Sequence, residues 1–207
     1  AIEAFAQDVR VRTGQQVKTI ALDVLDFNSH QPFYDGLDEK PEGVVTFVGY
    51  LGDQTVAEER FDEALKTINS NFTGLVSILN IVANDFEQKK SGFIVGISSV
   101  AGDRGRASNY IYGSAKAGFT AYLSGLRNRL YGSDVHVLTV KPGFVATRMT
   151  ENMDLPAALT AQPEEVAEDI FKAQHKNKNI IYTKWYWRLI MRVIKTIPEW
   201  LFKRMGL

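Results

Sequence analysis

Residues 98–118 have the sequence SSVAGDRGRASNYIYGSAKAG, and this stretch decides the fold prediction. Ser99 ends a run of apolar residues, and Tyr112 and Lys116 follow it with helical spacing. Residues four apart lie on the same face of a helix. In an open parallel sheet, ligands bind beyond the carboxyl ends of the strands. The stretch therefore predicts a strand, a loop and a helix that bring a serine, a tyrosine and a lysine to one site.

These three side chains suit proton transfer to or from a carbonyl or an alcohol. A phenol is a poor base at neutral pH, because its reference pKa is about 10. A nearby ammonium favours the phenolate, so we expect Lys116 to lower the pKa of Tyr112 by roughly two to three pH units. The Ser99 hydroxyl would hydrogen-bond the substrate oxygen. A lone Tyr-x-x-x-Lys pair is common in helices, but the spacing from Ser99 and the strand–loop–helix setting favour catalysis over simple packing.

The rest of the chain alternates predicted strands with predicted helices. Several of the strands are apolar throughout, which is typical of a parallel sheet covered on both faces. We therefore predict an α/β fold, a doubly wound parallel sheet of Rossmann-like type, formed by residues 1–184 as one domain. Strands are predicted at 17–24, 43–52, 92–99, 135–143 and 179–184, and helices at 1–14, at 57–89 with a division near 69–74, at 109–131 and at 163–176.

The composition excludes several kinds of protein. The formal net charge is zero, so nothing in the overall charge indicates a nucleic-acid partner. The chain has no cysteine, and its three histidines are scattered, so we predict no disulfide and no metal site. No apolar run reaches the length of about 18 residues that a membrane-spanning helix needs.

The motifs in 98–118 resemble the active-site segment of the short-chain dehydrogenase/reductase family. The resemblance covers about residues 1–183 and is strongest over 92–147. It implies that Ser99 rather than the neighbouring Ser98 is the catalytic serine. It also implies that the asparagine of NFTG (71–74) helps to hold a chain of water molecules to the lysine, with Asn69 as its close competitor. The catalytic residues implied by the resemblance are Ser99, Tyr112, Lys116 and Asn71.

The resemblance also implies a nicotinamide dinucleotide cofactor, either NAD or NADP. Asp23 matches the family's acidic residue beside the adenine, and Thr147 in KPGFVAT (141–147) would contact the nicotinamide carboxamide. The cofactor-binding residues implied in this way are Asp23, Val24, Val48, Gly49, Tyr112, Lys116, Pro142, Gly143, Val145 and Thr147.

Two departures from the family pattern concern cofactor binding. The family's Asn-Asn-Ala-Gly turn appears here as FVGYLG (47–52), which keeps only Gly49 at the matching place. The glycine-rich turn that receives the pyrophosphate is absent, so we expect 17–24 and 43–50 to be the family's third and fourth strands, without the two that lie between them. We therefore expect an N-terminally incomplete fold, with roughly 35 or more residues before Ala1. We also expect weak dinucleotide binding by these residues alone.

These features predict an NAD(P)-dependent oxidoreductase that interconverts a ketone and a secondary alcohol by hydride transfer. The alternative is a non-catalytic dinucleotide-sensing or scaffold protein on the same fold, which would not need to retain Ser99, Tyr112 and Lys116 together. A serine hydrolase is disfavoured, because GISSVAG lacks the G-x-S-x-G motif and no histidine has a convincing partner position.

A narrower similarity concerns the substrate. Three segments and the basic, aromatic tail are similar to bacterial reductases related to the decaprenylphosphoryl 2-keto-sugar reductases. The segments are YLGDQ (50–54), SSVAGDRGR (98–106) and GFVATRMT (143–150). The resemblance suggests a small-molecule or lipid-linked carbonyl substrate, such as a keto-sugar.

The tail at 185–207 differs from the rest of the chain, since it holds all three tryptophans and several basic residues. Pro198 should break its helix. One interpretation is a lid or a helix packed on a neighbouring subunit, and the other is a helix lying on a membrane surface. The family resemblance further implies a homodimer or homotetramer formed by 57–89 and 109–131, and we expect a cytoplasmic protein with peripheral contact at the inner membrane face through 185–207.

Overall fold

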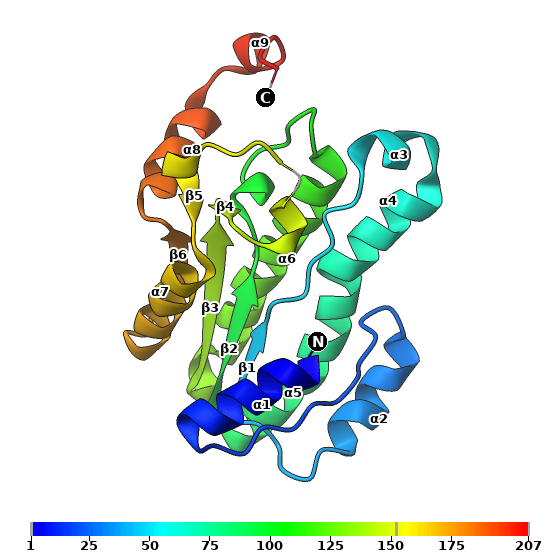
Figure 1. Cartoon of the computed structure of the whole chain (residues 1–207), viewed down its shortest axis with the longest axis vertical. Coiled ribbons are helices and arrows are strands. Elements are labelled where there is room, and N and C mark those ends of the chain that lie inside the picture. The colour runs from blue at the N-terminus through cyan, green and yellow to red at the C-terminus, as the bar shows by residue number, and fades with distance from the viewer. Residues whose placement is uncertain (1, 152, 207) are drawn as a thin grey trace.

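The computed structural model describes residues 2–151 and 153–206, and its centre is a four-stranded parallel sheet (Figure 1). The strands are β1 (Gly43–Thr46), β2 (Gly92–Ile97), β3 (Val135–Pro142) and β6 (Ile180–Thr183), in the order β1-β2-β3-β6. A short parallel pair, β4 (Phe144–Val145) and β5 (Thr160–Ala161), lies beyond the end of β3. Every strand pair in the main sheet is parallel, as predicted.

Both faces of the sheet are buried, which confirms the doubly wound prediction. Ile94 in β2 belongs to a core that also contains Leu79 of α5 (Gly74–Lys89) and Phe119 of α6 (Tyr110–Leu130). The next residue, Val95, faces the opposite way and packs with Ile170 of α7 (Pro163–His175). Because side chains alternate along a strand, a strand that is apolar at successive positions must be covered on both sides.

The predicted long helix over 57–89 is divided into three parts. α3 (Gln54–Glu59) and α4 (Phe61–Ile68) meet at Arg60, whose backbone is extended. A π-helical turn, Asn69–Thr73, then joins α4 to α5, at the division predicted near 69–74. The first residue of α5, Gly74, lies against the backbone of Val24. A side chain does not fit there, because a Cβ at Gly74 would lie 2.3 Å from the carbonyl oxygen of Val24.

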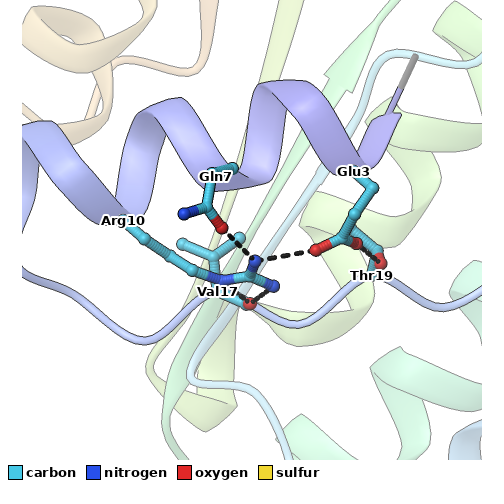
Figure 2. A network of polar contacts seen from close by, with 5 residues as sticks. All are labelled: Glu3, Gln7, Arg10, Val17 and Thr19. Atoms are coloured by element: carbon cyan, nitrogen blue, oxygen red, sulfur yellow. Dashed lines mark hydrogen bonds and ion pairs between the residues drawn. The ribbon is translucent and has the colours of Figure 1, made fainter.

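The prediction of a strand at 17–24 is wrong. The helix α1 (Ile2–Thr13) ends before Gly14, and the chain then returns along the helix in an irregular conformation. Figure 2 shows the contacts that hold it: the Arg10 guanidinium donates to the carbonyl oxygen of Val17, and the Thr19 hydroxyl donates to Glu3 at 2.5 Å. Glu3 also pairs with Arg10 at 2.7 Å. Local polar contacts replace a strand neighbour here, so the β-branched pattern does not produce a strand.

β1 is the edge strand of the described sheet, and β2 is its one strand neighbour there. Val45 is 41% exposed and Phe47, just after the strand, is 68% exposed. The short helix α2 (His30–Asp35) packs on α5 through the buried residues His30 and Tyr34.

The C-terminal segment folds back over its own chain. α8 (Tyr186–Thr196) buries Trp187 and Met191 against Val100 and neighbouring apolar residues. The helix ends before Pro198, as predicted, and α9 (Glu199–Phe202) follows. Arg104 binds the end of α8, because its Nη1 donates to the carbonyl oxygens of Ile194 and Ile197, both at 2.6 Å. One side of α8 therefore packs on the protein's own chain, whereas the packing on a neighbouring subunit expected from the sequence stays a prediction.

Candidate active site

Ser99 and Tyr112 lie together at the carboxyl end of β2, as predicted. Ser99 follows the strand and caps a short 3-10 turn, Val100–Gly102, accepting a hydrogen bond from the Ala101 amide at 3.1 Å. The Ser99 hydroxyl is also close enough to Tyr112 to favour a lower pKa of that phenol. Both side chains line a cavity of about 580 Å³. The end of β2 thus positions the serine, and the first turn of α6 positions the tyrosine.

Ser98 has a structural role instead. Its side chain is buried, and its hydroxyl donates to the carbonyl oxygen of Lys116 at 3.0 Å and contacts the Thr120 hydroxyl at 2.7 Å. These contacts hold α6 against the end of β2. Ser99 is therefore the serine with a hydroxyl toward Tyr112, which favours the choice made from its spacing.

Lys116 lies one turn after Tyr112 and is almost completely buried, with 2% of its surface exposed. Its Nζ donates to the carbonyl oxygen of Ile97 at 3.1 Å and lies 5.7 Å from the ring centre of Tyr112. Burial lowers the pKa of Lys116 to about 8, because the ammonium loses solvation. At neutral pH most of the amine is therefore still protonated, but a small rise in pH begins to deprotonate it.

The predicted lowering of the Tyr112 pKa is not found. Burial raises the pKa of Tyr112, and the hydrogen bond from Ser99 opposes that rise only in part. The expectation was wrong because it considered the charge of Lys116 without the desolvation that both side chains share. In this structure Tyr112 is a neutral phenol that can donate a proton.

Asn71 is completely buried in the π-helical turn. Its side-chain amide donates to the carbonyl oxygens of Tyr50 and Thr67 at 2.5 and 2.7 Å, and its Oδ1 accepts from the Tyr50 amide at 3.2 Å. The competitor, Asn69, uses its carbonyl oxygen to accept the Gly74 amide. Asn71 therefore holds the segment that follows β1 beside the site.

Gly49 lies in that segment and lines the cavity together with Val48. A Cβ at Gly49 would lie 3.5 Å from Asn71 Oδ1, 3.8 Å from Lys116 Nζ and 3.3 Å from the methyl group of Met149. The one glycine that is kept from the family turn thus lies close to two of the predicted catalytic side chains, Asn71 and Lys116.

The segment after β3 forms the opposite part of the cavity wall. The lining residues there that were predicted from the sequence are Pro142, Gly143, Val145 and Thr147. Lys141, just before them, pairs with Asp103 at 2.5 Å, and the Tyr182 hydroxyl donates to Asp103 at 2.7 Å. This buried network connects the loop after β2 to β3 and β6.

Asp23 and Val24 lie outside the cavity wall. Asp23 accepts hydrogen bonds within a local turn, from the amides of Leu25 and Asp26, and it does not end a strand. Val24 packs against Gly74 at the start of α5. The structure therefore brings the predicted nicotinamide-side residues together, and it does not bring the two predicted adenine-side residues to them.

Sequence reasoning missed several polar residues of the cavity, among them Arg106 and Asn109. Both belong to the loop between β2 and α6, inside the stretch that decided the fold prediction. Their position between Ser99 and Tyr112 was a signal, because a loop that joins two site residues is itself close to the site.

Comparison with known proteins agrees with this geometry. The short chain dehydrogenase family matches residues 1–157. An uncharacterized oxidoreductase of Mycobacterium tuberculosis is 36% identical over 192 residues, covering 91% of this chain and 77% of the relative. An uncharacterized oxidoreductase of Streptomyces coelicolor is 34% identical over 196 residues, covering 93% and 76%. The solved structure of a short-chain dehydrogenase from Sphingobium yanoikuyae in complex with NADPH is similar with a TM-score of 0.80 and 20% identity, covering 95% of this chain and 82% of that one.

The serine, tyrosine and lysine at the end of a parallel sheet, and the match to the family over three quarters of the chain, lead to one conclusion. The chain belongs to the short chain dehydrogenase family of oxidoreductases.

Proposed function

We propose that this protein interconverts a ketone and a secondary alcohol, with a nicotinamide dinucleotide as the redox partner. The observation that carries the proposal is the convergence of Ser99, Tyr112 and Lys116 on one cavity at the carboxyl end of β2. The NADPH complex of the Sphingobium yanoikuyae dehydrogenase, which shares the fold, supports a cofactor of this class.

The cavity fits the nicotinamide half of such a cofactor. Its walls are mainly apolar, Gly49 leaves room beside Lys116, and Pro142–Thr147 supply backbone groups on the other side. When bound, the cofactor would supply or accept the hydride.

The chain's own residues would handle the proton. The Tyr112 hydroxyl would donate to the carbonyl oxygen during reduction and accept the proton back during oxidation. The Ser99 hydroxyl, which lies beside it, would hold the same oxygen in place. Lys116 would stabilise negative charge on the phenol oxygen, since a pKa of about 8 leaves most of its amine protonated at neutral pH. Asn71 is a positioning residue, because it acts through the segment at Tyr50.

The alternative is a non-catalytic dinucleotide sensor or scaffold. A sensor needs residues that bind the cofactor, but it does not need a serine, a tyrosine and a buried lysine that all line the same cavity. Cofactor binding without turnover of any carbonyl would favour this alternative.

The experiment is a panel assay on the full-length gene product. Oxidation of NADH and NADPH would be followed by absorbance with small ketones, keto-sugars and lipid-linked keto-sugars. We expect turnover of at least one ketone class, with a preference for one of the two cofactors. If the protein binds the cofactor but turns over no ketone of the panel, the proposed interconversion of a ketone and a secondary alcohol is wrong.

We also propose that the tail contacts an anionic membrane surface, at the cytoplasmic face of the inner membrane. Among residues 2–151 and 153–206, no helix is both long enough and apolar enough to cross a bilayer, so such contact would be peripheral. The side of α8 that does not pack on the chain exposes Leu189 and Val193, at 50% and 63%, and Trp185 at 72%. Arg188 and Arg192 are exposed beside them. Apolar groups flanked by cations suit an interface with anionic headgroups. This contact would suit a lipid-linked substrate.

We further propose self-association through α4, α5 and α6. α6 exposes small residues, among them Ala121 and Gly125, and a Cβ at Gly125 would meet nothing within 4 Å. α4 exposes Phe61 at 73% and Leu65 at 43%. Small residues allow two helices to approach closely, and exposed apolar residues benefit from burial. These features support a homodimer or a homotetramer.

A further inference from the structure

Arg106 is a partly buried arginine of the loop between β2 and α6, and none of the hydrogen bonds or ion pairs among the described residues involves its side chain. It lines the same cavity as Ser99 and Tyr112. Its Nε is buried and has no hydrogen-bond partner among the described residues. Burial lowers the pKa of Arg106, and no neighbouring carboxylate opposes this effect. A buried N–H donor without a partner is unfavourable, so the Nε of Arg106 is better satisfied when an acceptor enters the cavity.

The contrast with Arg104, two residues earlier, shows that the loop can satisfy an arginine. Arg104 donates to the carbonyl oxygens of Ile194 and Ile197, pairs with Glu199 at 2.9 Å and lies over the ring of Phe202. Arg104 points to the tail, whereas Arg106 lines the cavity. One arginine of this loop therefore stabilises the fold, and the other makes no side-chain hydrogen bond or ion pair within residues 2–151 and 153–206.

The cavity itself favours an anion. Its described lining contains three cationic side chains, Arg106, Lys116 and Arg148, and no aspartate or glutamate. Most of the remaining lining is apolar, which strengthens any charge–charge contact inside it. Arg148 directly follows Thr147 on the proposed cofactor side, and Arg106 belongs to the loop that leads to Tyr112.

Asn109 provides a second unsatisfied group beside Arg106. Its Oδ1 is buried and has no hydrogen-bond partner in the part of the chain that the structure describes, and its side chain does not cap α6, although Asn109 is the N-cap residue. Asn109 also lines a smaller neighbouring cavity of about 140 Å³, which shares Tyr112 with the first. An acceptor and a cationic donor are thus both left open next to the proposed acid–base residue.

We propose that Arg106 binds an anionic group, a carboxylate or a phosphate ester, of the carbonyl substrate. Asn109 accepts a hydrogen bond from a hydroxyl of the same molecule. The inference rests on the proposed function for the site of reaction, and it adds the chemical class of the substrate: a hydroxylated carbonyl compound with a negative charge. A guanidinium suits this task, because it offers a planar pair of donors to a carboxylate or phosphate.

Matched pairs of probes test the charge. The first pair is 4-acetylbenzoate and its methyl ester, and the second is dihydroxyacetone phosphate and dihydroxyacetone. The assay measures kcat/KM for each probe in the full-length protein. We expect the wild type to favour the charged member of at least one pair, and the favoured pair distinguishes a carboxylate from a phosphate.

Arg106→Met should lower kcat/KM for the charged probe by about 10- to 100-fold, as expected for a hydrogen bond to a charged group. The neutral probe should change by less than about threefold, since it makes no such contact. Arg106→Lys should recover part of the difference because it restores the charge without the planar donors. Arg12→Met removes an exposed arginine of α1 and is the matched control, with no expected change.

Calorimetry without cofactor separates this proposal from the proposed function. The wild type should bind 4-acetylbenzoate or dihydroxyacetone phosphate more tightly than the neutral partner, and Arg106→Met should lose this preference. That result would support the anion site even if no carbonyl were turned over. In that case the proposed oxidoreductase function would be wrong, and the proposed anion site would still stand. Equal binding and turnover of charged and neutral probes by the wild type would overturn the proposal. A variant effect confined to the KM of the cofactor would also overturn it, because Arg106 would then serve the cofactor phosphate. If Arg106→Met does not fold, Arg106→Gln and Arg106→Lys carry the same comparison.

Discussion

The indole of Trp187 lies directly against Gly143, so that a Cβ at position 143 would come within 2.0 Å of the ring. The same indole meets the ring of Phe144 edge-on at 5.3 Å and donates to the carbonyl oxygen of Leu159 at 3.3 Å. The C-terminal helix therefore packs on the segment that forms one wall of the active-site cavity.

Gly143→Ala should displace Trp187 and destabilise the protein by roughly 1–3 kcal/mol, as overpacking in a filled core does. The cavity wall at Pro142–Thr147 should shift with it, so cofactor affinity should fall. Thermal unfolding and cofactor titration measure the two effects. Gly132→Ala is the matched control, because a Cβ there would meet nothing within 4 Å. Equal stability of the two variants would show that Trp187 does not pack on Gly143.

Tyr112→Phe should abolish turnover with the fold retained, since the change removes only a hydroxyl. Loss of a positioned general acid lowers the rate by about 10²- to 10⁴-fold. Single-turnover kinetics and circular dichroism check the two parts. Tyr110→Phe removes a hydroxyl from the exposed tyrosine two residues earlier and should keep full activity. Near-normal turnover in Tyr112→Phe would show that Tyr112 is not the general acid of the reaction.

Lys116 should make stability depend on pH. Its pKa in the folded protein is about 8, below the ordinary value of 10.5, so the unfolded chain binds more protons between these values. The free energy of unfolding should therefore rise with pH between about 8 and 10.5, and this group should contribute on the order of 3 kcal/mol to the rise. Below pH 8 the contribution of Lys116 should no longer change with pH.

Lys116→Met removes the titrating group, so its free energy of unfolding should not show the part of the rise with pH that Lys116 causes. Urea unfolding at a series of pH values from 7 to about 10.5 measures it as the difference between the variant and the wild type. Lys90→Met removes a lysine from the surface and should follow the wild type. Parallel profiles of Lys116→Met and wild type would mean that the amine is not desolvated.

The tail should bring the protein to anionic membranes. Vesicles that contain phosphatidylglycerol should sediment the protein at low salt, and vesicles of phosphatidylcholine alone should not. Added salt should weaken the binding, since exposed charges are screened. Leu189→Ser combined with Val193→Ser should abolish it without unfolding, because both side chains are exposed.

Val11→Ser is the control, since Val11 is 75% exposed on α1, away from the tail segment. Salt-independent binding, or binding that survives the double variant, would contradict the proposed surface. Absence of binding at low salt would leave α8 as a packed helix only.

Self-association should depend on the small exposed residues of α6. Ala121→Arg should shift the protein toward the monomer in light scattering at micromolar concentration, because a long charged side chain prevents close helix approach. Ala4→Arg makes the same exchange at an exposed position of α1 and should leave the mass unchanged. A wild type that is monomeric under these conditions would contradict the proposed assembly.

Local patterns in the sequence determined the helices and the core of the sheet. The apolar run of β2 and the four-residue spacing of Tyr112 and Lys116 needed no distant information, because a helix satisfies its hydrogen bonds within itself and fixes which residues share a face. The choice of Ser99 over Ser98 also followed from spacing, and the structure agrees with it through the contacts of Ser98 with α6.

Tertiary structure alone decided the remaining features. Residues 17–24 have a strand-like composition but no strand neighbour, and a strand needs a partner for its backbone hydrogen bonds. The pKa of Tyr112 depends on how deeply neighbouring elements bury it, so the charge of Lys116 was not sufficient to predict the direction. The unpaired Arg106 and the contact of Trp187 with Gly143 likewise depend on which segments meet in space, and packing between distant segments leaves no periodic trace in the sequence.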